Sequence, residues 1–218
     1  MPPTPEAAAA LAARVAARYR DRGRFARYYV AGKLRHDPAL AAILALGPLG
    51  EIVDLGCGRG QLGLALLEAG AARNLHGLDW DEAALADASA ASGGLPARFT
   101  RADLARAEIP GGDTVMLIDA LYQLPAGAQP GLLDRAAAAA RKLLLVRALD
   151  PERGWRSRVG LFMEGGLWVS GRYRRAAIRP MPVPRLRAAL EAAGFAFSVE
   201  PCWGRLPLPN VLVVARRR

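Results

Sequence analysis

Val53-Asp54-Leu55-Gly56-Cys57-Gly58-Arg59-Gly60 is the stretch that decides the fold. An apolar run ends in three glycines at alternate positions, and residues 61–69 then follow a helical pattern up to Gly70. Glycine lets the backbone turn sharply and approach a ligand closely, and the N-terminus of the following helix favours a negative group. The stretch therefore predicts a strand, a glycine-rich turn and a helix that together hold a ligand.

Strand and helix patterns alternate after this stretch. The predicted strands are 51–55, 74–79, 97–101, 113–119, 142–147, 195–200 and 210–215, and the predicted helices are 61–69, 81–92, 130–141 and 184–193. Apolar strands separated by helices are typical of a parallel sheet covered on both faces, which predicts a doubly wound α/β fold. The last two strands are joined by too few residues for a helical crossover, so we expect them to pair antiparallel.

Two segments fall outside this alternation. The first is helical and precedes the glycine-rich turn, with stretches at about 5–20, 22–35 and 38–47, the third capped by Asp37. We interpret residues 1–47 as a helical cover and residues 48–218 as the main domain. The second segment, 151–182, is rich in arginine, glycine and aromatic residues, and we interpret it as a substrate cap inserted into the main domain.

Composition and charge bound the class of protein. The 218 residues are 52 % hydrophobic, enough for a substantial core, and the formal net charge is +10. Residues 1–37 carry +5 and residues 151–218 carry +9, whereas the middle carries −4. Basic flanks attract an acidic partner, which leaves RNA, an anionic membrane surface and an acidic carrier protein open; surface arginine that only keeps the protein soluble is equally compatible.

Cysteine usage and the N-terminus indicate a cytoplasmic protein. Cys57 and Cys202 are the only cysteines and form no metal-type pair, so no metal site is expected. The N-terminus lacks a basic region, and arginines interrupt the alanine-rich stretch behind it. We therefore expect neither a signal peptide nor a transmembrane segment.

The glycine pattern distinguishes two classes of cofactor. A dinucleotide-binding turn has the pattern G-x-G-x-x-G, but its third glycine is replaced here by Gln61, and Gly60 is present instead. Asp54, two residues before the first glycine, would face a pyrophosphate badly, whereas it would suit the ammonium group of an amino acid. The pattern thus disfavours a nicotinamide-dependent oxidoreductase without removing it from consideration.

Further acidic residues stand at the ends of the next three strands. Asp79 ends the second strand and Trp80 follows it; a carboxylate there can bind both hydroxyls of a ribose, and an indole can pack on an adenine. Asp103 and Leu104 stand at the end of the third strand, and Asp119 ends the fourth. Because the carboxyl ends of parallel strands meet at one edge of a sheet, we expect a single ligand site there.

In this order the motifs resemble class I methyltransferases that use S-adenosyl-L-methionine (SAM), over residues 48–150 and through the last strand pair to the C-terminus. The resemblance implies a sheet of order 3-2-1-4-5-7-6 with strand 7 antiparallel. It also implies that Gly56, Gly58 and Gly60 line the methionine part of SAM, with Cys57 beside it. Asp79 would bind the ribose, Asp103 the adenine amino group, and Asp119 would lie near the methionine end. The segments 26–38 and 200–212 are also similar to small methyltransferases of polyketide and aryl-polyene pathways.

Candidate catalytic and substrate-binding residues are less sharply defined. The candidate general bases are Tyr122, Asp119 and His36. The candidate substrate-binding residues are aromatic, because such side chains suit an apolar acceptor: Tyr28, Tyr29, Trp155, Phe162 and Trp168. Packing in the core or in the cap would equally explain an aromatic side chain at any of these positions.

The predicted reaction is methyl transfer to a small, largely apolar acceptor, aromatic or polyene, which an acidic acyl carrier protein could hold. RNA methylation would use the same basic charge, but the chain has no Asn-Pro-Pro-Tyr-type motif after the fourth strand. Many relatives carry histidine there, where this chain has Tyr122 and Gln123. A SAM-binding protein without catalytic activity therefore stays among the alternatives.

Overall fold

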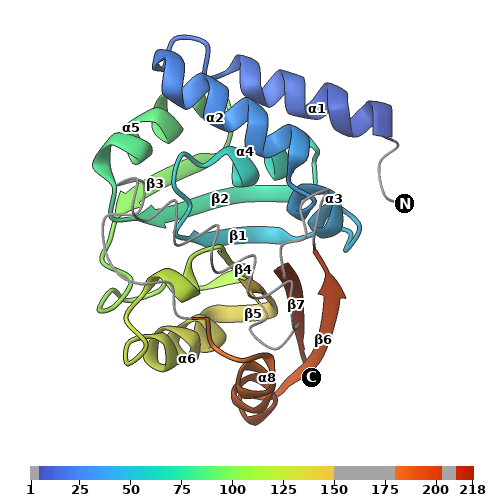
Figure 1. The fold of residues 1–218 in the computed structure, drawn as a ribbon, viewed down its shortest axis with the longest axis vertical. Helices are drawn as coiled ribbons and strands as arrows, with labels where there is room; N and C mark the ends of the chain where they lie inside the picture. The colour runs from blue at the N-terminus through green and yellow to red at the C-terminus, as the bar shows by residue number, and fades with distance from the viewer. Residues whose placement is uncertain (1–4, 150–179, 203–209) are drawn as a thin grey trace.

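The computed structural model describes residues 5–149, 180–202 and 210–218. In this part of the chain one seven-stranded sheet has the order β3-β2-β1-β4-β5-β7-β6 (Figure 1). Its strands are β1 (Gly50–Leu55), β2 (Ala72–Asp79), β3 (Ala97–Arg101), β4 (Gly112–Ile118), β5 (Ala140–Leu149), β6 (Phe195–Pro201) and β7 (Asn210–Arg217). The first five strands pair in parallel, and β7 runs antiparallel to both β5 and β6. The predicted fold class is therefore confirmed.

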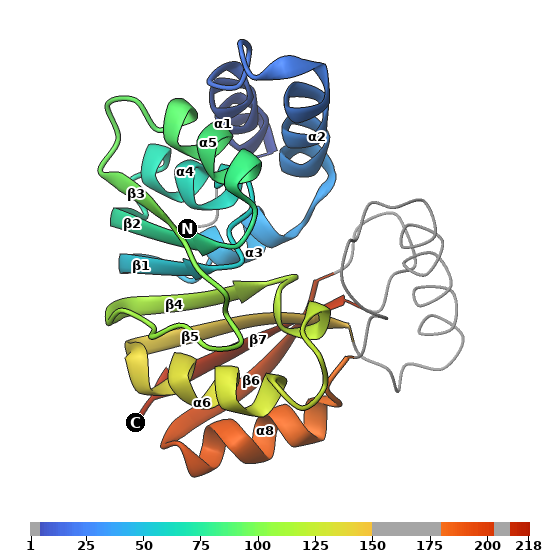
Figure 2. The same ribbon diagram turned by 90° about the vertical axis from the view of Figure 1, so that its left-hand side faces the viewer.

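Helices cover both faces of the sheet (Figure 2). They are α1 (Pro5–Ala17), α2 (Gly23–His36), α3 (Ala39–Leu44), α4 (Gln61–Glu68), α5 (Glu82–Ala91), the 3-10 turn η1 (Leu121–Gln123), α6 (Gln129–Ala139) and α8 (Val183–Ala192). Helices α1 to α4 pack on one face of the sheet and form one hydrophobic core with it. Helices α6 and α8 pack on the other face and form a second core. Adjacent residues of β1 enter opposite cores, Ile52 the first and Val53 the second, which explains why the strands are apolar throughout. No described helix is long and apolar enough to cross a membrane.

The predicted boundaries differ from the observed ones by a few residues. The first helix ends at Ala17 rather than Arg20, and residues 18–20 continue it as a turn. The third helix is shorter than predicted, Ala39–Leu44, and the side chain of Asp37 accepts the backbone N–H of Ala39 at 2.9 Å. Strand β5 is longer than predicted because its pairing with β7 continues as far as Leu149.

The N-terminal helices are joined to α4 and α5 by polar contacts as well as by the core. Arg18 Nε donates to Glu68 Oε1 at 2.7 Å, and Arg22 pairs with Asp87 at 3.2 Å. Tyr19 is fully buried, and its hydroxyl donates to the backbone oxygen of Arg59 at 2.6 Å. The cover thus contacts the glycine-rich turn directly. The division into a cover and a main domain stays a prediction.

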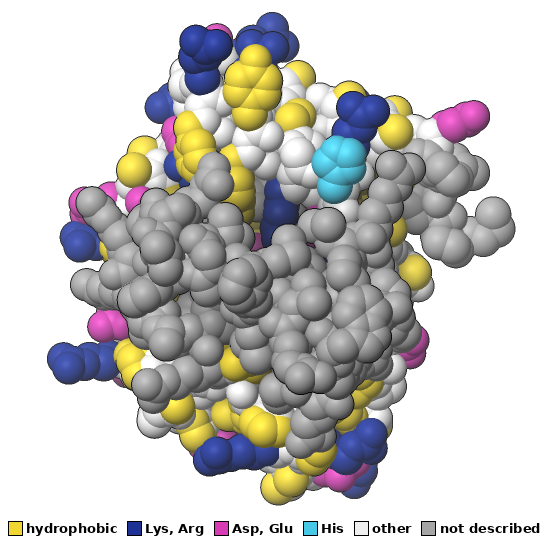
Figure 3. All heavy atoms as spheres, in the orientation of Figure 1, with side chains coloured by type: hydrophobic (Ala, Val, Ile, Leu, Met, Phe, Trp, Pro, Cys, Tyr) yellow, Lys and Arg dark blue, Asp and Glu magenta, His cyan; other side chains and the backbone are white. Residues whose placement is uncertain are grey.

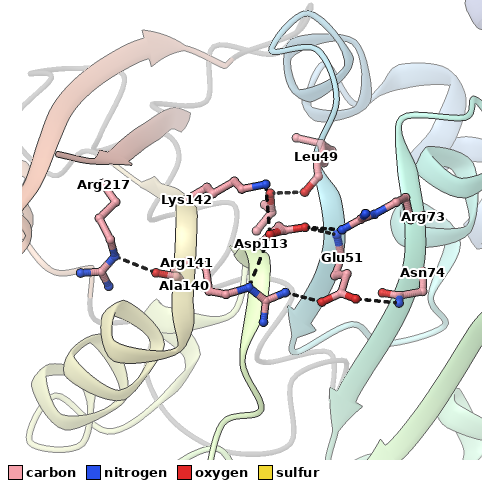
Figure 4. A network of polar contacts seen from close by, with 10 residues as sticks. Leu49, Glu51, Arg73, Asn74, Asp113, Ala140, Arg141, Lys142 and Arg217 are labelled. Carbon is pink, nitrogen blue, oxygen red and sulfur yellow. Dashed lines mark hydrogen bonds and ion pairs between the residues drawn. The ribbon is translucent and has the colours of Figure 1, made fainter.

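A charged network joins the starts of the strands at the amino edge of the sheet (Figure 4). Asp113 at the start of β4 accepts the backbone N–H of Glu51 at 3.2 Å and the guanidinium of Arg73 at 2.8 Å. Arg141 and Lys142 at the start of β5 pair with the same carboxylate at 3.4 and 3.3 Å. The backbone hydrogen bond from Glu51, followed by these cations, lowers the pKa of Asp113 to about 2. These contacts hold the starts of β1, β2, β4 and β5 together. The pocket lies at the opposite, carboxyl edge of the sheet.

Candidate functional site

A pocket of about 650 Å³ lies at the carboxyl edge of the sheet. The residues that follow β1, β2, β3 and β4 line it together with residues of α2 and α3. Strands β1 and β4 are neighbours, but the chain continues from β1 to β2 and from β4 to β5 in opposite directions along the sheet. Such a reversal of strand order opens a crevice, where ligands bind in open α/β sheets.

The glycine-rich turn has a backbone that other residues could not easily reproduce. Gly56 has φ +78, and a Cβ there would lie 2.5 Å from the Cβ of Ala120. Gly60 has φ +72, and a Cβ there would lie 2.8 Å from the ring of Phe99. At Gly58, by contrast, a Cβ would meet nothing within 4 Å. The turn is therefore closely packed at Gly56 and Gly60, and it leaves open space at Gly58, which lines the pocket.

Asp79 presents a fixed carboxylate at the end of β2. Its Oδ2 accepts the backbone N–H of Gly58 at 2.7 Å, and its Oδ1 accepts that of Asp81 at 3.0 Å. Only 8 % of Asp79 is exposed. Each carboxylate oxygen has more than one acceptor position, so both can still accept a ligand hydroxyl. The two backbone hydrogen bonds thus orient the carboxylate so that it can accept both hydroxyls of a diol.

Asp54, at the end of β1, is a second carboxyl group in the same pocket. It is 3 % exposed, and burial together with the nearby charge of Asp79 raises its pKa to about 7. A buried carboxylate is costly unless a cation or hydrogen-bond donors accompany it. A ligand ammonium group at Asp54 would supply that compensation; this role of Asp54 stays a prediction.

Four charged residues form a compact cluster at one side of the pocket. Lys33 Nζ lies 2.8 Å from Asp119 Oδ2 and 2.7 Å from Asp37 Oδ2. Arg147 Nη1 lies 3.0 and 2.7 Å from the same two oxygens. The cluster therefore joins α2, the end of β4 and β5 through two cations and two carboxylates.

Burial alone would favour the neutral forms of these groups, but the opposite charges outweigh it. Asp119 and Asp37 raise the pKa values of Lys33 and Arg147, and Lys33 and Arg147 lower that of Asp37. Asp119 itself has φ +59, a left-handed conformation that few non-glycine residues adopt and that neighbouring contacts must hold. The opposite charges thus favour the charged forms of Lys33, Arg147 and Asp37, and the backbone of Asp119 is structurally constrained.

Most predicted cofactor residues meet in this pocket. The residues that line it are Asp54, Gly56, Cys57, Gly58, Asp79, Trp80, Asp103, Leu104 and Asp119. Gly60 lies behind the turn, at the N-terminus of α4. Burial and the charges of Asp54 and Asp79 raise the pKa of Cys57 well above its ordinary value, so its thiol keeps its proton and acts as a small space-filling group.

The predicted catalytic and substrate-binding residues are more dispersed. Tyr29 lines the pocket, whereas Tyr28 is 67 % exposed and does not. Tyr122 is buried in η1 away from the pocket, and His36 is exposed at the end of α2. Three further candidates, Trp155, Phe162 and Trp168, lie outside the described residues. Most of the predicted cap, 151–182, lies outside them as well.

Sequence reasoning missed several polar residues of the site. Lys33 and Asp37 were not assigned to it, although their i, i+4 spacing at the end of a helix predicts a pair. Arg147 ends an otherwise apolar run, Leu143 to Val146, and that isolated charge at the carboxyl edge was the available signal. Gln61 is 8 % exposed and lines the pocket, and its Oε1 has no hydrogen-bond partner among the described residues.

The chain is similar to methyltransferases both in a domain of its sequence and in its fold. Residues 52–142 match the family described as "Methyltransferase domain". Magnesium protoporphyrin IX methyltransferase from Synechocystis PCC 6803, with bound SAH, is 23 % identical, with TM-score 0.64 over 83 % of this chain and 80 % of that one. An O-methyltransferase family protein from Burkholderia thailandensis is 19 % identical, with TM-score 0.66 over 83 % and 55 %. The pyocyanin biosynthetic protein PhzM is 24 % identical, with TM-score 0.62 over 88 % and 58 %. The chain thus spans little more than half of the latter two, and no curated protein sequence matches it.

Proposed function

Because residues 52–142 match a methyltransferase domain, we propose that this chain uses SAM to methylate a small, largely apolar acceptor. The observation that carries the proposal is the convergence of Asp54, Gly58 and Asp79 in one pocket. An amino-acid nucleoside fits the open space beside Gly58 and the carboxylate of Asp79. It also fits the buried carboxyl of Asp54, which forms no ion pair with any residue that the structure describes. A dinucleotide would instead bring a pyrophosphate toward two carboxylates.

Each part of the pocket has a role in this proposal. Asp79 would accept the ribose hydroxyls, Asp103 the adenine amino group, and Asp54 the methionine ammonium. When bound, the cofactor supplies a methyl group on a sulfonium that needs no further activation. The protein's own contribution is then to align the acceptor and exclude water. A general base is needed only for an acceptor proton of high pKa, and of the three candidates Asp119 alone lines the pocket.

Apolar side chains that line the pocket support an apolar acceptor. They come from α2, α3, α4, the end of β4 and the segment after η1: Leu34, Leu40, Leu62, Ile118, Leu124 and Pro125. Tyr29 adds an aromatic ring to the same pocket. An acidic acyl carrier protein as holder of the acceptor, and a cytoplasmic location, stay predictions from the sequence.

Calorimetric titration with S-adenosylhomocysteine, with NAD as the control ligand, tests the cofactor. We expect dissociation constants in the micromolar range for the former and no binding of NAD. Binding of NAD alone would overturn the proposal. Methyl transfer from labelled SAM to hydrophobic phenols, with total RNA as the competing acceptor, then tests the substrate class. Transfer to RNA alone would replace the small acceptor by a nucleic acid.

We expect the affinity for S-adenosylhomocysteine to depend on the protonation of Asp54. In the free protein its carboxyl titrates at about pH 7, and an ammonium ligand would favour the charged form. The dissociation constant should therefore rise as the pH falls below 7, by up to about tenfold per pH unit for one linked proton. Titrations between pH 5.5 and 8.5 measure this slope.

The variant Asp54→Asn separates this effect from a general influence of pH. It should bind more weakly at pH 8 and show no such slope. The ligand-free protein offers a second check, because a raised carboxyl pKa means that the folded state keeps a proton that the unfolded chain has lost. This contribution to stability falls as the pH rises from about 4 to 7, and Asp54→Asn should remove it. An equal pH slope in the variant would exclude Asp54 as its origin.

A further inference from the structure

Large hydrophobic side chains that are exposed gather on one helix. In the described part of the chain they are Phe25, Tyr28, Tyr29 and Trp80, with exposed fractions of 53, 67, 43 and 43 %. Three of the four lie within five residues of α2. Single exposed hydrophobic residues are ordinary, whereas a group of them marks a surface that meets another molecule.

Basic residues share this surface. Arg24, Arg27 and Arg35 are exposed on α2, and the helix contains no acidic residue. We call the exposed side chains of Arg24, Phe25, Arg27, Tyr28, Tyr29 and Arg35 the outer face of α2. Asp21 is exposed just before the helix, and the acidic groups after the helix and beneath it, Asp37 and Asp87, are engaged in ion pairs. The outer face is therefore positive as well as aromatic, and it would attract an anionic partner.

The outer face of α2 adjoins the opening of the pocket. Tyr29 belongs to the face and also lines the pocket, and Lys33, one helical turn further on, lines it as well. Figure 3 shows hydrophobic and basic side chains together over α2, beside a hollow in the surface. A partner that covered the outer face would thus lie beside residues that line the pocket.

The arrangement of the rings favours a lipid surface over RNA. Phe25 and Tyr29 stack on each other, with centroids 5.9 Å apart, and the guanidinium of Arg59 lies over both rings at 5.1 and 5.7 Å. Base recognition by stacking needs free ring faces, which this stack leaves scarce. Aromatic side chains interleaved with arginines are instead typical of helices that lie in the headgroup region of a bilayer.

We propose that the outer face of α2 docks the opening of the pocket onto an anionic membrane surface. Arg24, Arg27 and Arg35 would pair with lipid phosphates, while Phe25 and Tyr28 would enter the headgroup region. This inference rests on the proposed function in one respect, because a largely apolar acceptor would reach the pocket from the bilayer in which it dissolves. The attraction should weaken as salt screens the charges.

Cosedimentation of the full chain with vesicles tests the proposal. We expect binding to equal parts of phosphatidylcholine and phosphatidylglycerol, and little binding to phosphatidylcholine alone. The double variant Arg24→Glu/Arg27→Glu should lower binding at least about tenfold, because each basic residue near a charged bilayer contributes appreciably. Tyr28→Ser should lower it less. The matched control is Arg185→Glu/Arg216→Glu, which makes the same change in net charge on exposed residues of α8 and β7.

Each outcome of the vesicle experiment either supports or overturns the membrane proposal. Equal loss in the double variant and its control would mean that net charge, not this face, is responsible, and would overturn the proposal. So would the absence of binding to anionic vesicles, or binding of RNA or an acidic carrier protein in place of vesicles. S-adenosylhomocysteine titration of every variant shows that it is folded. It also keeps the two proposals apart, because cofactor binding without vesicle binding refutes only the membrane surface.

Discussion

Replacing Asp79 with alanine is expected to weaken the binding of S-adenosylhomocysteine by at least about a hundredfold. Each hydrogen bond to a charged acceptor contributes about 1.5–3 kcal/mol, and two ribose hydroxyls would lose theirs. The variant also removes the acceptor of the Gly58 N–H, so the glycine-rich turn loses a contact that holds its shape. Calorimetric titration at pH 8 measures the change directly.

Asp79→Ala removes a negative charge as well as the hydrogen bonds to the ribose, so the two effects need separate controls. Asp79 contributes to the raised pKa of Asp54, so its removal also makes Asp54 easier to ionise and slightly favours an ammonium ligand. The loss measured for Asp79→Ala therefore combines the ribose hydrogen bonds and the altered turn with this smaller, opposite effect of Asp54. Asp134→Ala removes an equal charge from an exposed position on α6 and should leave the dissociation constant unchanged. A dissociation constant equal to that of the wild type in Asp79→Ala would disprove the assignment of the ribose site.

Arg147→Met is expected to lower the free energy of unfolding by about 3–5 kcal/mol, because it leaves two largely buried carboxylates without one of their cations. The side chain of Arg147 is 5 % exposed and contacts both Asp37 and Asp119. Lys33 alone would have to compensate both. Denaturation in urea at pH 7, followed by circular dichroism, measures the loss.

Two further variants identify the cause of this destabilisation. Arg101→Met breaks an exposed pair with Glu82 and should cost at most about 1 kcal/mol. Arg147→Met combined with Asp37→Asn removes one cation and one negative charge together, so it should recover part of the stability. If the double variant is as unstable as Arg147→Met alone, lost packing rather than an unpaired carboxylate is the cause.

The local elements and the outline of the site followed from the sequence. The run from Val53 to Gly60 sets its own conformation, because an apolar strand, three glycines at fixed spacing and a helix start are all short-range features. Asp79 and Asp103 follow predicted strands, and the carboxyl ends of parallel strands necessarily meet at one edge. The sheet order came from the resemblance, not from periodicity, because strand patterns do not say which strands are neighbours.

Only the tertiary structure showed which charges meet. Lys33 and Asp119 are 86 residues apart, and Arg147 and Asp37 are 110 apart, so their contacts depend on how α2 packs across the ends of β4 and β5. Tyr122 is buried where η1 packs against α6 and β5, although its position after a strand predicted the pocket. Short-range sequence determines the conformation of a strand, a turn or a helix. The partners of a side chain at the surface of such an element are decided by long-range packing, because burial and opposite charge act over distances in space and not along the chain.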